Sequence, residues 1–299
     1  MKNIWGIDLG GTKIECAVLN PKTYEVIVRK RVPTEAAGGY GHILNQVQKL
    51  ISSVSEEAEE MPTHLGFGTP GVLDPETKVM KNCNTTALNG RQLNKDLEAL
   101  LKVPVKLAND ANCFALAETK MGAGKNYPGA EVVFGVILGT GVGGGLVFNK
   151  KIINGHHGIG GEWGHNVLEE NGYSCYCGKH GCVETVISGP ALERRYFELA
   201  GQSLNLSEIL KKHESHADAE ATKVIDRLLE NFGKAISVVI NIVDPDLIII
   251  GGGVGNIDLL YTEGYERIKK YIFNSGRFNA TLCKPLLGDS AGVFGAALL

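Results

Sequence analysis

Apolar residues in the first third of the chain follow the spacing of strands and then that of a helix. Three short apolar runs within residues 3–32, NIWGIDLG, IECAVLN and YEVIVRKRV, are separated by turn residues and predict three consecutive strands. From Gly39 to Glu59 the apolar residues recur at helical spacing, which predicts an amphipathic helix. HLGFGTPG (64–71) and VPVKLAND (103–110) predict two further strands, and ANCFALAETKMG (111–122) predicts a helix directly after the second.

The same pattern then begins again. EVVFGVILGTGVGGGLVFN (131–149) predicts a strand, a glycine turn and a second strand, as at the N-terminus. Helices follow, among them a long one from about Ala219 to Ile242, and DPDLIIIGGGVGN (244–256) predicts a strand, a glycine turn and a helix. Two halves of similar construction predict a duplicated α/β fold of two domains with a cleft between them. We place the domains at residues 1–120 and 121–289, and we expect the final helix, about residues 290–299, to return to the first domain.

The composition excludes several classes of protein. Hydrophobic residues make up 43% and charged residues 21% of the 299 positions, as in soluble globular proteins large enough for two domains. The net charge of −3 and the lack of a Lys/Arg block give no sign of nucleic-acid binding. Apolar runs fall short of the roughly 20 residues that span a bilayer, and the N-terminus lacks the apolar segment of a secretion signal. We therefore expect a cytoplasmic protein with no nucleic-acid or membrane partner.

Glycine clusters follow three of the predicted strands: DLGGTK (8–13), LGTGVGGG (138–145) and GGGVG (251–255). Because glycine lacks a Cβ atom, successive backbone N–H groups can approach a phosphate closely. None of the clusters matches a P-loop or a convincing Rossmann fingerprint. A single cluster is typical of a tight β-turn, but three at strand ends in a duplicated α/β chain favour phosphate binding. Asp8 could orient hydrated Mg²⁺ beside such phosphates, or serve only as a turn or helix-capping residue.

One histidine and three cysteines lie close together in the second half, at the spacing His165-x9-Cys175-x-Cys177-x4-Cys182. An imidazole and three thiolates suit a tetrahedral, structural Zn²⁺ with no position left for a catalytic water. A disulfide would leave the histidine unexplained and is disfavoured in the cytosol, and a nucleophilic Cys–His pair would not need three thiols. The remaining cysteines are expected to be small buried residues: Cys16, Cys83, Cys113 and Cys283.

Several of these motifs, taken together, resemble the ROK family of bacterial sugar kinases and repressors. The motifs are DLGGTK, GTPG (68–71), LANDANC (107–113), LGTGVGGG, GEWGH (161–165), CYCGKHGCVE (175–184) and DPDLIIIGGG (244–253). The resemblance runs from residue 8 to the C-terminus and implies a two-domain actin/hexokinase-like, ribonuclease H-like fold and a homodimer. Repressors of the family carry a helix-turn-helix segment before the first glycine turn. Because the first predicted strand begins by about residue 3, we expect the kinase branch.

The resemblance also implies roles for individual residues. Asp110 would be the catalytic base that takes the proton of the sugar hydroxyl during phosphoryl transfer from ATP, although a helix N-cap is the plain alternative at a strand–helix junction. His165 would use one ring nitrogen for zinc and the other for the sugar. Further sugar contacts would come from Asn109, Glu162 and Glu184, and from Gly71 and Asn84, which are also plausible turn residues. The ATP phosphates would be held by Gly10, Gly11, Thr12, Lys13, Gly139, Thr140 and Gly141, and the adenosine end by Gly251, Gly252 and Gly253.

The identity of the sugar is less clearly encoded. NCNTTALNGRQLNKDL, GEWGHN and CYCGKHGCVETVISG are similar to the fructokinase/mannokinase branch of the family, whereas ILGTGVGGGLVFN and ANCFALAE are similar to N-acetylglucosamine kinases. The Gly-Trp usual in glucokinases of the family is absent near Asn89-Gly90. We expect an ATP- and Mg²⁺-dependent hexose kinase acting on the 6-hydroxyl, first of fructose or mannose. The alternatives are glucose, N-acetylglucosamine or N-acetylmannosamine as the substrate, and, from a different class, a non-catalytic sugar-binding regulator.

Overall fold

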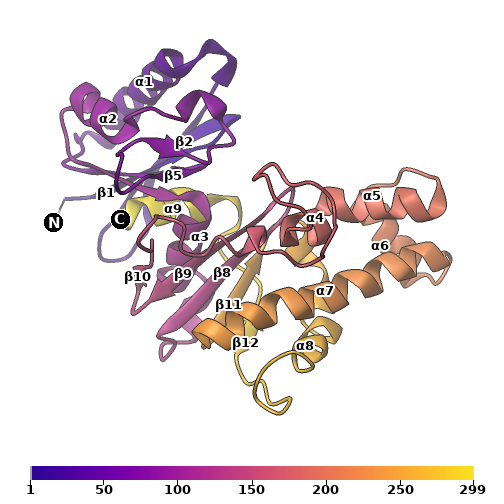
Figure 1. The fold of residues 1–299 in the computed structure, drawn as a ribbon. Helices are drawn as coiled ribbons and strands as arrows, with labels where there is room; N and C mark the ends of the chain where they lie inside the picture. The colour runs from indigo at the N-terminus through magenta and orange to yellow at the C-terminus, as the bar shows by residue number, and fades with distance from the viewer. Residues whose placement is uncertain (1) are drawn as a thin grey trace. The chain divides into compact units, whose positions relative to one another are not determined.

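A computed structural model of the chain describes residues 2–299 (Figure 1). It divides into two compact units. The first unit comprises Met1–Asn126, Gly145–Gly160 and Leu286–Leu299, and the second comprises Tyr127–Gly144 and Gly161–Pro285. Residues 121–126 and 145–160, which we assigned from the sequence to the second domain, thus belong to the first unit. The reason is tertiary packing, because strand β10 (Lys151–Ile152) lies against helix α3 (Asp110–Lys120) of that unit.

The first unit is built on a five-stranded sheet with the order β3-β2-β1-β4-β7. Strands β1 (Ile4–Leu9), β2 (Lys13–Leu19) and β3 (Val26–Pro33) are antiparallel neighbours. Strands β4 (Leu65–Thr69) and β7 (Val105–Asn109) run parallel to β1. All five strands follow the predicted apolar runs. Because β1, β4 and β7 run the same way, the residues after their carboxyl ends meet at one edge of the sheet.

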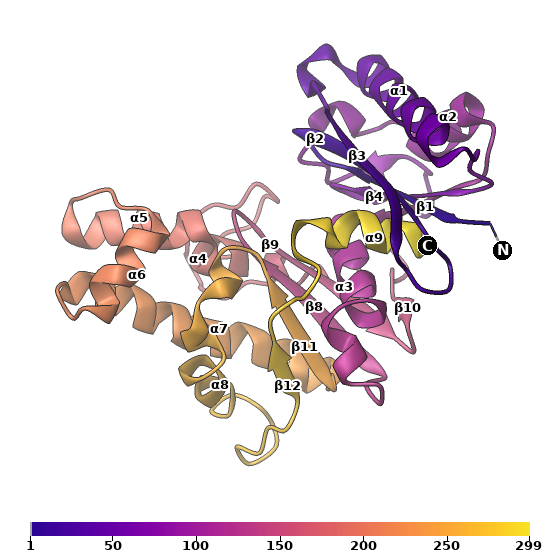
Figure 2. The ribbon, with the colours of Figure 1, turned by 180° about the vertical axis from the view of Figure 1, so that it is seen from behind.

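Helices cover this sheet. Helix α1 (Tyr40–Ala58) buries the apolar positions that predicted it, and α2 (Leu93–Leu101) follows the loop that contains η2 (Thr86–Leu88) and the hairpin β5 (Val72–Leu73)–β6 (Met80–Lys81). The C-terminal helix α9 (Ala291–Ala297) packs against α3, β1 and β4, and Figure 2 shows it beside α3. The segment before α9 is held by the fully buried Glu118 of α3, whose carboxylate accepts hydrogen bonds from the backbone N–H groups of Leu286 and Leu287. The remaining short helices of this unit are η1 (Ala36–Gly38), η3 (Ala123–Asn126) and η7 (Gly288–Ser290).

The sheet associated with the second unit repeats this construction in the order β10-β9-β8-β11-β12. Strands β8 (Val132–Leu138) and β9 (Val142–Phe148) flank a glycine turn, and β11 (Leu247–Gly251) pairs in parallel with both β8 and β12 (Thr281–Cys283). The long helix predicted from about residue 219 to 242 is α7 (Ala219–Val243). The other helices are α4 (Val183–Ile187), α5 (Gly189–Ala200), α6 (Leu206–Glu214), α8 (Glu263–Ile268), η4 (Trp163–His165), η5 (Val254–Asn256) and η6 (Asp258–Leu260). Within residues 2–299, none of the helices combines the length and the apolar character that a membrane span requires.

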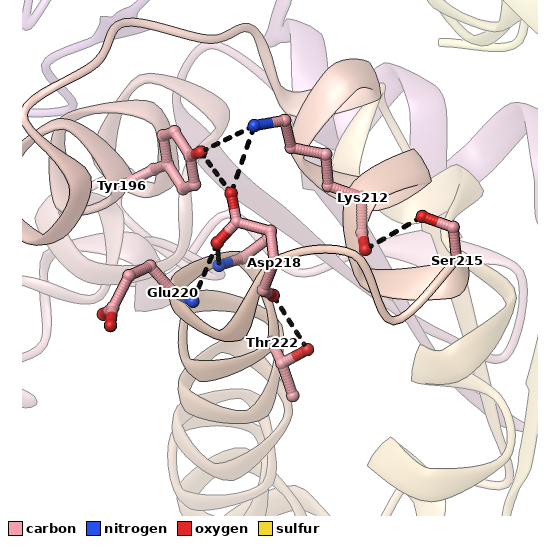
Figure 3. A network of polar contacts seen from close by, with 7 residues as sticks. Tyr196, Lys212, Ser215, Asp218, Glu220 and Thr222 are labelled. Carbon is pink, nitrogen blue, oxygen red and sulfur yellow. Dashed lines mark hydrogen bonds and ion pairs between the residues drawn. The ribbon is translucent and has the colours of Figure 1, made fainter.

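A polar network joins α5, α6 and α7 in the second unit. Figure 3 shows Asp218, the N-cap of α7, beside Tyr196 and Lys212. The buried Tyr196 hydroxyl donates to Asp218 Oδ2 at 2.6 Å, and Lys212 Nζ lies 3.2 Å from the same oxygen. Asp218 Oδ1 accepts from the backbone N–H groups of Glu220 and Ala221. The Tyr196 hydrogen bond, followed by the bond from Ala221, holds the pKa of Asp218 well below its usual range.

Replacing Asp218 with asparagine is expected to lower the melting temperature at pH 7, and the loss should shrink at pH 3. The folded-state pKa of Asp218 is depressed, so its stabilisation is present above the unfolded-state pKa of about 3.9 and is lost as the pH falls toward the folded value. Thermal unfolding followed by circular dichroism at both pH values measures this. Asp258→Asn, at an exposed aspartate paired with Lys284, is the matched control and should change little. An equal loss for Asp218→Asn at both pH values would contradict the expectation.

Candidate active site

In the first unit, Asp8, Asn109 and Asp110 lie at the edge where β1, β4 and β7 end. Asp8 pairs in register with Gly68, and Thr69 pairs with Asn109. Asn109 is the N-cap of α3, because its side-chain oxygen accepts from the Ala111 N–H at 2.9 Å. Asp110 is therefore the first residue of the helix rather than its cap, and its Oδ1 accepts from the same N–H at 2.8 Å.

The electrostatics of this edge are dominated by the two aspartates. Asp110 is exposed to solvent as a residue. The surrounding protein nevertheless desolvates its carboxyl group, and this desolvation raises the pKa of Asp110. Burial raises the pKa of Asp8 to about 6, with a further contribution from the charge of Asp110 and, to a smaller extent, Glu15. Nearby carboxylates that disfavour one another's charge are stabilised by a cation. A carboxylate beside a phosphate-binding turn fits Mg²⁺, which takes one or two protein carboxylates and completes its shell with phosphates and water.

The turn between β1 and β2 contains Gly10, Gly11, Thr12 and Lys13. It is closed by a hydrogen bond from Gly10 N to Lys13 O at 3.0 Å, and the Thr34 hydroxyl donates to Gly10 O at 2.6 Å. Gly11 and Thr12 are exposed at its tip. These hydrogen bonds hold the base of the turn in place, and its exposed tip is accessible to a ligand.

Gly71 and Asn84 lie in neighbouring loops of the first unit, where the Asn84 N–H donates to Pro70 O. Gly71 has a packing role, because a Cβ atom there would lie 2.5 Å from Cys83 Sγ. Asn84 is exposed, and its loop is held by Asn89, whose side chain bonds both backbone groups of Cys83 at 2.9 and 3.1 Å. This role of Asn89 was not predicted from the sequence, although an Asn-Gly pair is a strong turn signal.

In the second unit, two glycine turns lie at the carboxyl ends of the neighbouring parallel strands β8 and β11. The turn of Gly139, Thr140 and Gly141 is closed by a hydrogen bond from Gly139 N to Gly141 O at 2.9 Å. In the cluster of residues 251–253, Gly252 has a φ of +87°, and a Cβ atom on it would lie 2.2 Å from Leu138 O, so only glycine fits. The helix predicted after this cluster is a single turn of 3-10 helix, η5, which ends where Ile257 becomes extended.

Glu184, expected to bind the sugar, contacts the first of these turns. It is the second residue of α4, and its Oε2 accepts from the Val142 N–H at 2.9 Å. Val142 directly follows Gly141, so the carboxylate lies against the turn assigned to the ATP phosphates. The structure therefore places a predicted sugar residue and a predicted phosphate turn next to each other within one unit.

The residues proposed to bind zinc come together in the second unit. His165 ends η4, which is anchored by the buried Trp163, whose Nε1 donates to Gly143 O at 2.9 Å. The cysteines follow in a loop that turns at Gly178 and Gly181, both with positive φ. The candidate ligand atoms of His165, Cys175, Cys177 and Cys182 all lie within 4.8 Å of one another.

The distances within this cluster fit zinc better than a disulfide. Cys177 Sγ and Cys182 Sγ are 3.6 Å apart, and Cys175 Sγ is 3.5 Å from His165 Nδ1. A disulfide would need an S–S distance of about 2.05 Å. A tetrahedral ion with Zn–S bonds of about 2.3 Å separates two sulfurs by about 3.8 Å. The donor set and its spacing therefore suit a closed zinc site.

Tyr176 is a residue that the sequence analysis missed. Its hydroxyl lies 3.0 Å from His165 Nε2, the ring nitrogen that does not face the thiols. Although the residue is largely exposed, desolvation of its hydroxyl group raises the pKa of Tyr176 to about 12, and the charges of Glu184 and then Glu162 add to the shift. Glu162 is half-buried and is the N-cap residue of η4. No spacing rule for metal ligands singles out the residue between two cysteines, and its contact with His165 is visible only in three dimensions.

Comparison with known proteins gives relatives over the full length of the chain. Residues 4–299 match the sequence model of the ROK family. The chain is 36% identical to the N-acetyl-D-glucosamine kinase of Aliivibrio salmonicida (strain LFI1238), with 99% of this chain and 98% of that protein aligned. It is also 36% identical to the N-acetyl-D-glucosamine kinase of Histophilus somni (strain 129Pt), again with 99% and 98% aligned.

Solved structures of similar fold also cover nearly the whole chain. The ROK hexokinase from Thermus thermophilus superposes with a TM-score of 0.87 at 30% identity, covering 99% of this chain and 97% of that chain. The ROK family glucokinase from Streptomyces griseus, solved in complex with glucose and AMPPNP, superposes with a TM-score of 0.78 at 25% identity over 99% and 98%. The predicted duplicated α/β fold of the actin/hexokinase type is confirmed. With its motifs, its fold and its full-length relatives in agreement, the chain belongs to the ROK family.

Proposed function

We propose that this chain is an ATP-dependent sugar kinase that transfers the γ-phosphate to the 6-hydroxyl of N-acetylglucosamine. The relatives named above are N-acetyl-D-glucosamine kinases aligned over almost the whole chain. They support the alternative we derived from ILGTGVGGGLVFN and ANCFALAE over the first expectation of fructose or mannose. N-acetylmannosamine, glucose, mannose and fructose remain the comparison substrates, and a homodimer is part of the proposal.

The observation that carries the kinase assignment is the placement of Asp110. It stands one residue beyond the cap of α3, so its carboxylate is not needed to cap the helix, and it lies close enough to Asp8 to raise the pKa of that residue. As the general base, Asp110 takes the proton of the sugar hydroxyl when the hydroxyl attacks the γ-phosphate, and contributes about 10²–10⁴-fold to the rate. Asn109 stays fixed by its bond to Ala111 N and orients the substrate beside the base.

The remaining groups bind ATP. Asp8 would hold a hydrated Mg²⁺ ion through the water molecules bound to the ion. When bound, the ion would neutralise charge on the β- and γ-phosphates. The exposed tip of the Gly10–Lys13 turn offers backbone N–H groups to the phosphates from the first unit. In the second unit, the Gly139–Gly141 turn binds phosphate and the Gly251–Gly253 cluster binds the adenosine end.

The sugar hydroxyls are bound by Glu162, His165 and Glu184 of the second unit. Zinc would be held by His165 and the three cysteines Cys175, Cys177 and Cys182, and supplies a fixed cross-link rather than chemistry. The cluster spans the segment between Glu162 and Glu184, so closing it fixes the two carboxylates relative to one another. This lowers the ordering cost of sugar binding.

The substrate assignment is tested by measuring ADP release with Mg-ATP and each of five sugars: N-acetylglucosamine, N-acetylmannosamine, glucose, mannose and fructose. We expect kcat/KM to be highest for N-acetylglucosamine, by about tenfold or more over glucose, because a site that hydrogen-bonds an acetamido group discriminates against sugars without it. A preference for fructose would instead support our first expectation. Sugar binding without ADP release for any of the five would replace the kinase with a non-catalytic regulator.

A further inference from the structure

Tyr176 occupies an unusual place for a bulky aromatic residue, between two cysteines that converge on one point. The residue is 68% exposed, so burial does not account for its position. The ring stands edge-on to the His165 imidazole, with centroids 5.2 Å apart and an interplanar angle of 89°. The Tyr176 hydroxyl reaches His165 Nε2 at 3.0 Å, a normal hydrogen-bond distance.

The two ring nitrogens of His165 have different surroundings. Nδ1 is 3.5 Å from Cys175 Sγ and points into the thiol cluster, whereas Nε2 points to Tyr176. A metal ion binds the lone pair of a neutral imidazole, so a metal at Nδ1 places the ring proton on Nε2. Nε2–H then donates to the Tyr176 hydroxyl oxygen. Metal-binding histidines generally donate their second N–H to a carboxylate, a backbone carbonyl or water, which fixes the tautomer and the orientation of the ring. Here the Tyr176 hydroxyl oxygen takes the place of that acceptor.

We propose that Tyr176 is a positioning residue for the metal centre, whose hydroxyl accepts the Nε2–H bond of His165 and so presents Nδ1 to the ion. This inference rests on the metal centre contained in the proposed function. It assigns the residue between Cys175 and Cys177 a role that its spacing does not reveal. His165 is also expected to bind the sugar, and Nε2 is the ring nitrogen left for that contact. A bound sugar hydroxyl would therefore replace the Tyr176 hydroxyl at Nε2, and Tyr176 holds the imidazole in this orientation in the sugar-free site.

The test is the zinc affinity of Tyr176→Phe, which keeps the ring and removes only the hydroxyl. Affinity is measured on the full-length chain by competition with a chromophoric zinc chelator. We expect the dissociation constant to rise about 10–100-fold, the usual effect of removing a partner of a metal-binding histidine. Tyr173→Phe is the matched control. It makes the same change in the same loop, but the Tyr173 hydroxyl bonds Glu198 and not His165, so its zinc affinity should stay within about twofold of wild type.

A second readout is independent of catalysis and reports on the Nε2–H group of His165 itself. In ¹⁵N-labelled, zinc-loaded wild type, nuclear magnetic resonance should show a slowly exchanging His165 Nε2–H proton. This signal should disappear in Tyr176→Phe and persist in Tyr173→Phe. Unchanged zinc affinity in Tyr176→Phe, or an unchanged Nε2–H signal, would overturn the role of Tyr176 alone. A wild-type chain that binds no zinc would overturn the metal centre as well, and the kinase assay would then judge the proposed activity separately.

Discussion

Replacing Asp110 with asparagine is expected to lower kcat about 10²–10⁴-fold while sugar binding changes little. An amide cannot take the proton of the attacking hydroxyl, so the transition state loses its base. The amide oxygen can still accept the hydrogen bond from Ala111 N, so α3 should keep its first turn. Steady-state ADP release gives kcat, and isothermal titration calorimetry of the sugar gives the binding constant.

The control for this variant is Asp226→Asn, which makes the same chemical change at an exposed aspartate of α7 paired with Arg267. It should leave kcat unchanged. If Asp110→Asn kept kcat within about threefold of wild type, a smaller effect than general-base loss produces, Asp110 would not be the base. A loss of sugar binding together with activity would instead make Asp110 a binding residue.

Removing the metal is expected to destabilise the second unit and to weaken sugar binding. Without the ion, three thiols and an imidazole have no common partner, and the loop between His165 and Cys182 loses its cross-link. Stripping zinc with a chelator, or replacing Cys177 with serine, should lower the melting temperature by about 10 °C, which corresponds to roughly 3–5 kcal/mol for a domain of this size. The KM for the sugar should rise more than kcat falls, because the ion positions binding groups and not the base.

Two controls accompany this experiment. Adding zinc back to the stripped wild type should restore both the melting temperature and KM, whereas Cys177→Ser should not recover. Cys283→Ser changes a cysteine outside the cluster and should retain one zinc per chain by elemental analysis. A wild-type protein without bound metal, or a stripped protein with unchanged stability and KM, would contradict the structural role of zinc.

Much of the fold was predictable because local pattern and tertiary burial agree. The runs NIWGIDLG and DPDLIII became β1 and β11, and the apolar spacing before residue 243 marked α7 almost to its ends. Helix α2 was not predicted, although Leu93 and Leu97 lie at helical spacing and are buried. The assignment of residues 145–160 failed for another reason, since packing of β10 on α3 leaves no trace in the local sequence.

In the candidate site, too, local sequence features could be predicted and tertiary contacts could not. The glycine clusters and the His/Cys spacing could be recognised, because their chemistry restricts both residue type and spacing. Contacts made by side chains across loops could not be recognised. Examples are the bond of Glu184 to Val142 N and the bond of Tyr176 to His165. Each depends on how two separate segments pack, and each changes which atoms can reach a substrate.

Phosphoryl transfer to the 6-hydroxyl of an amino sugar can be tested through the identity of the product. Purified protein incubated with Mg-ATP and N-acetylglucosamine would be examined by ³¹P nuclear magnetic resonance. We expect a new phosphate monoester signal that is split by the two protons on C6 and grows in equal amount with ADP. Unchanged ATP, or ADP accompanied only by inorganic phosphate, would contradict it.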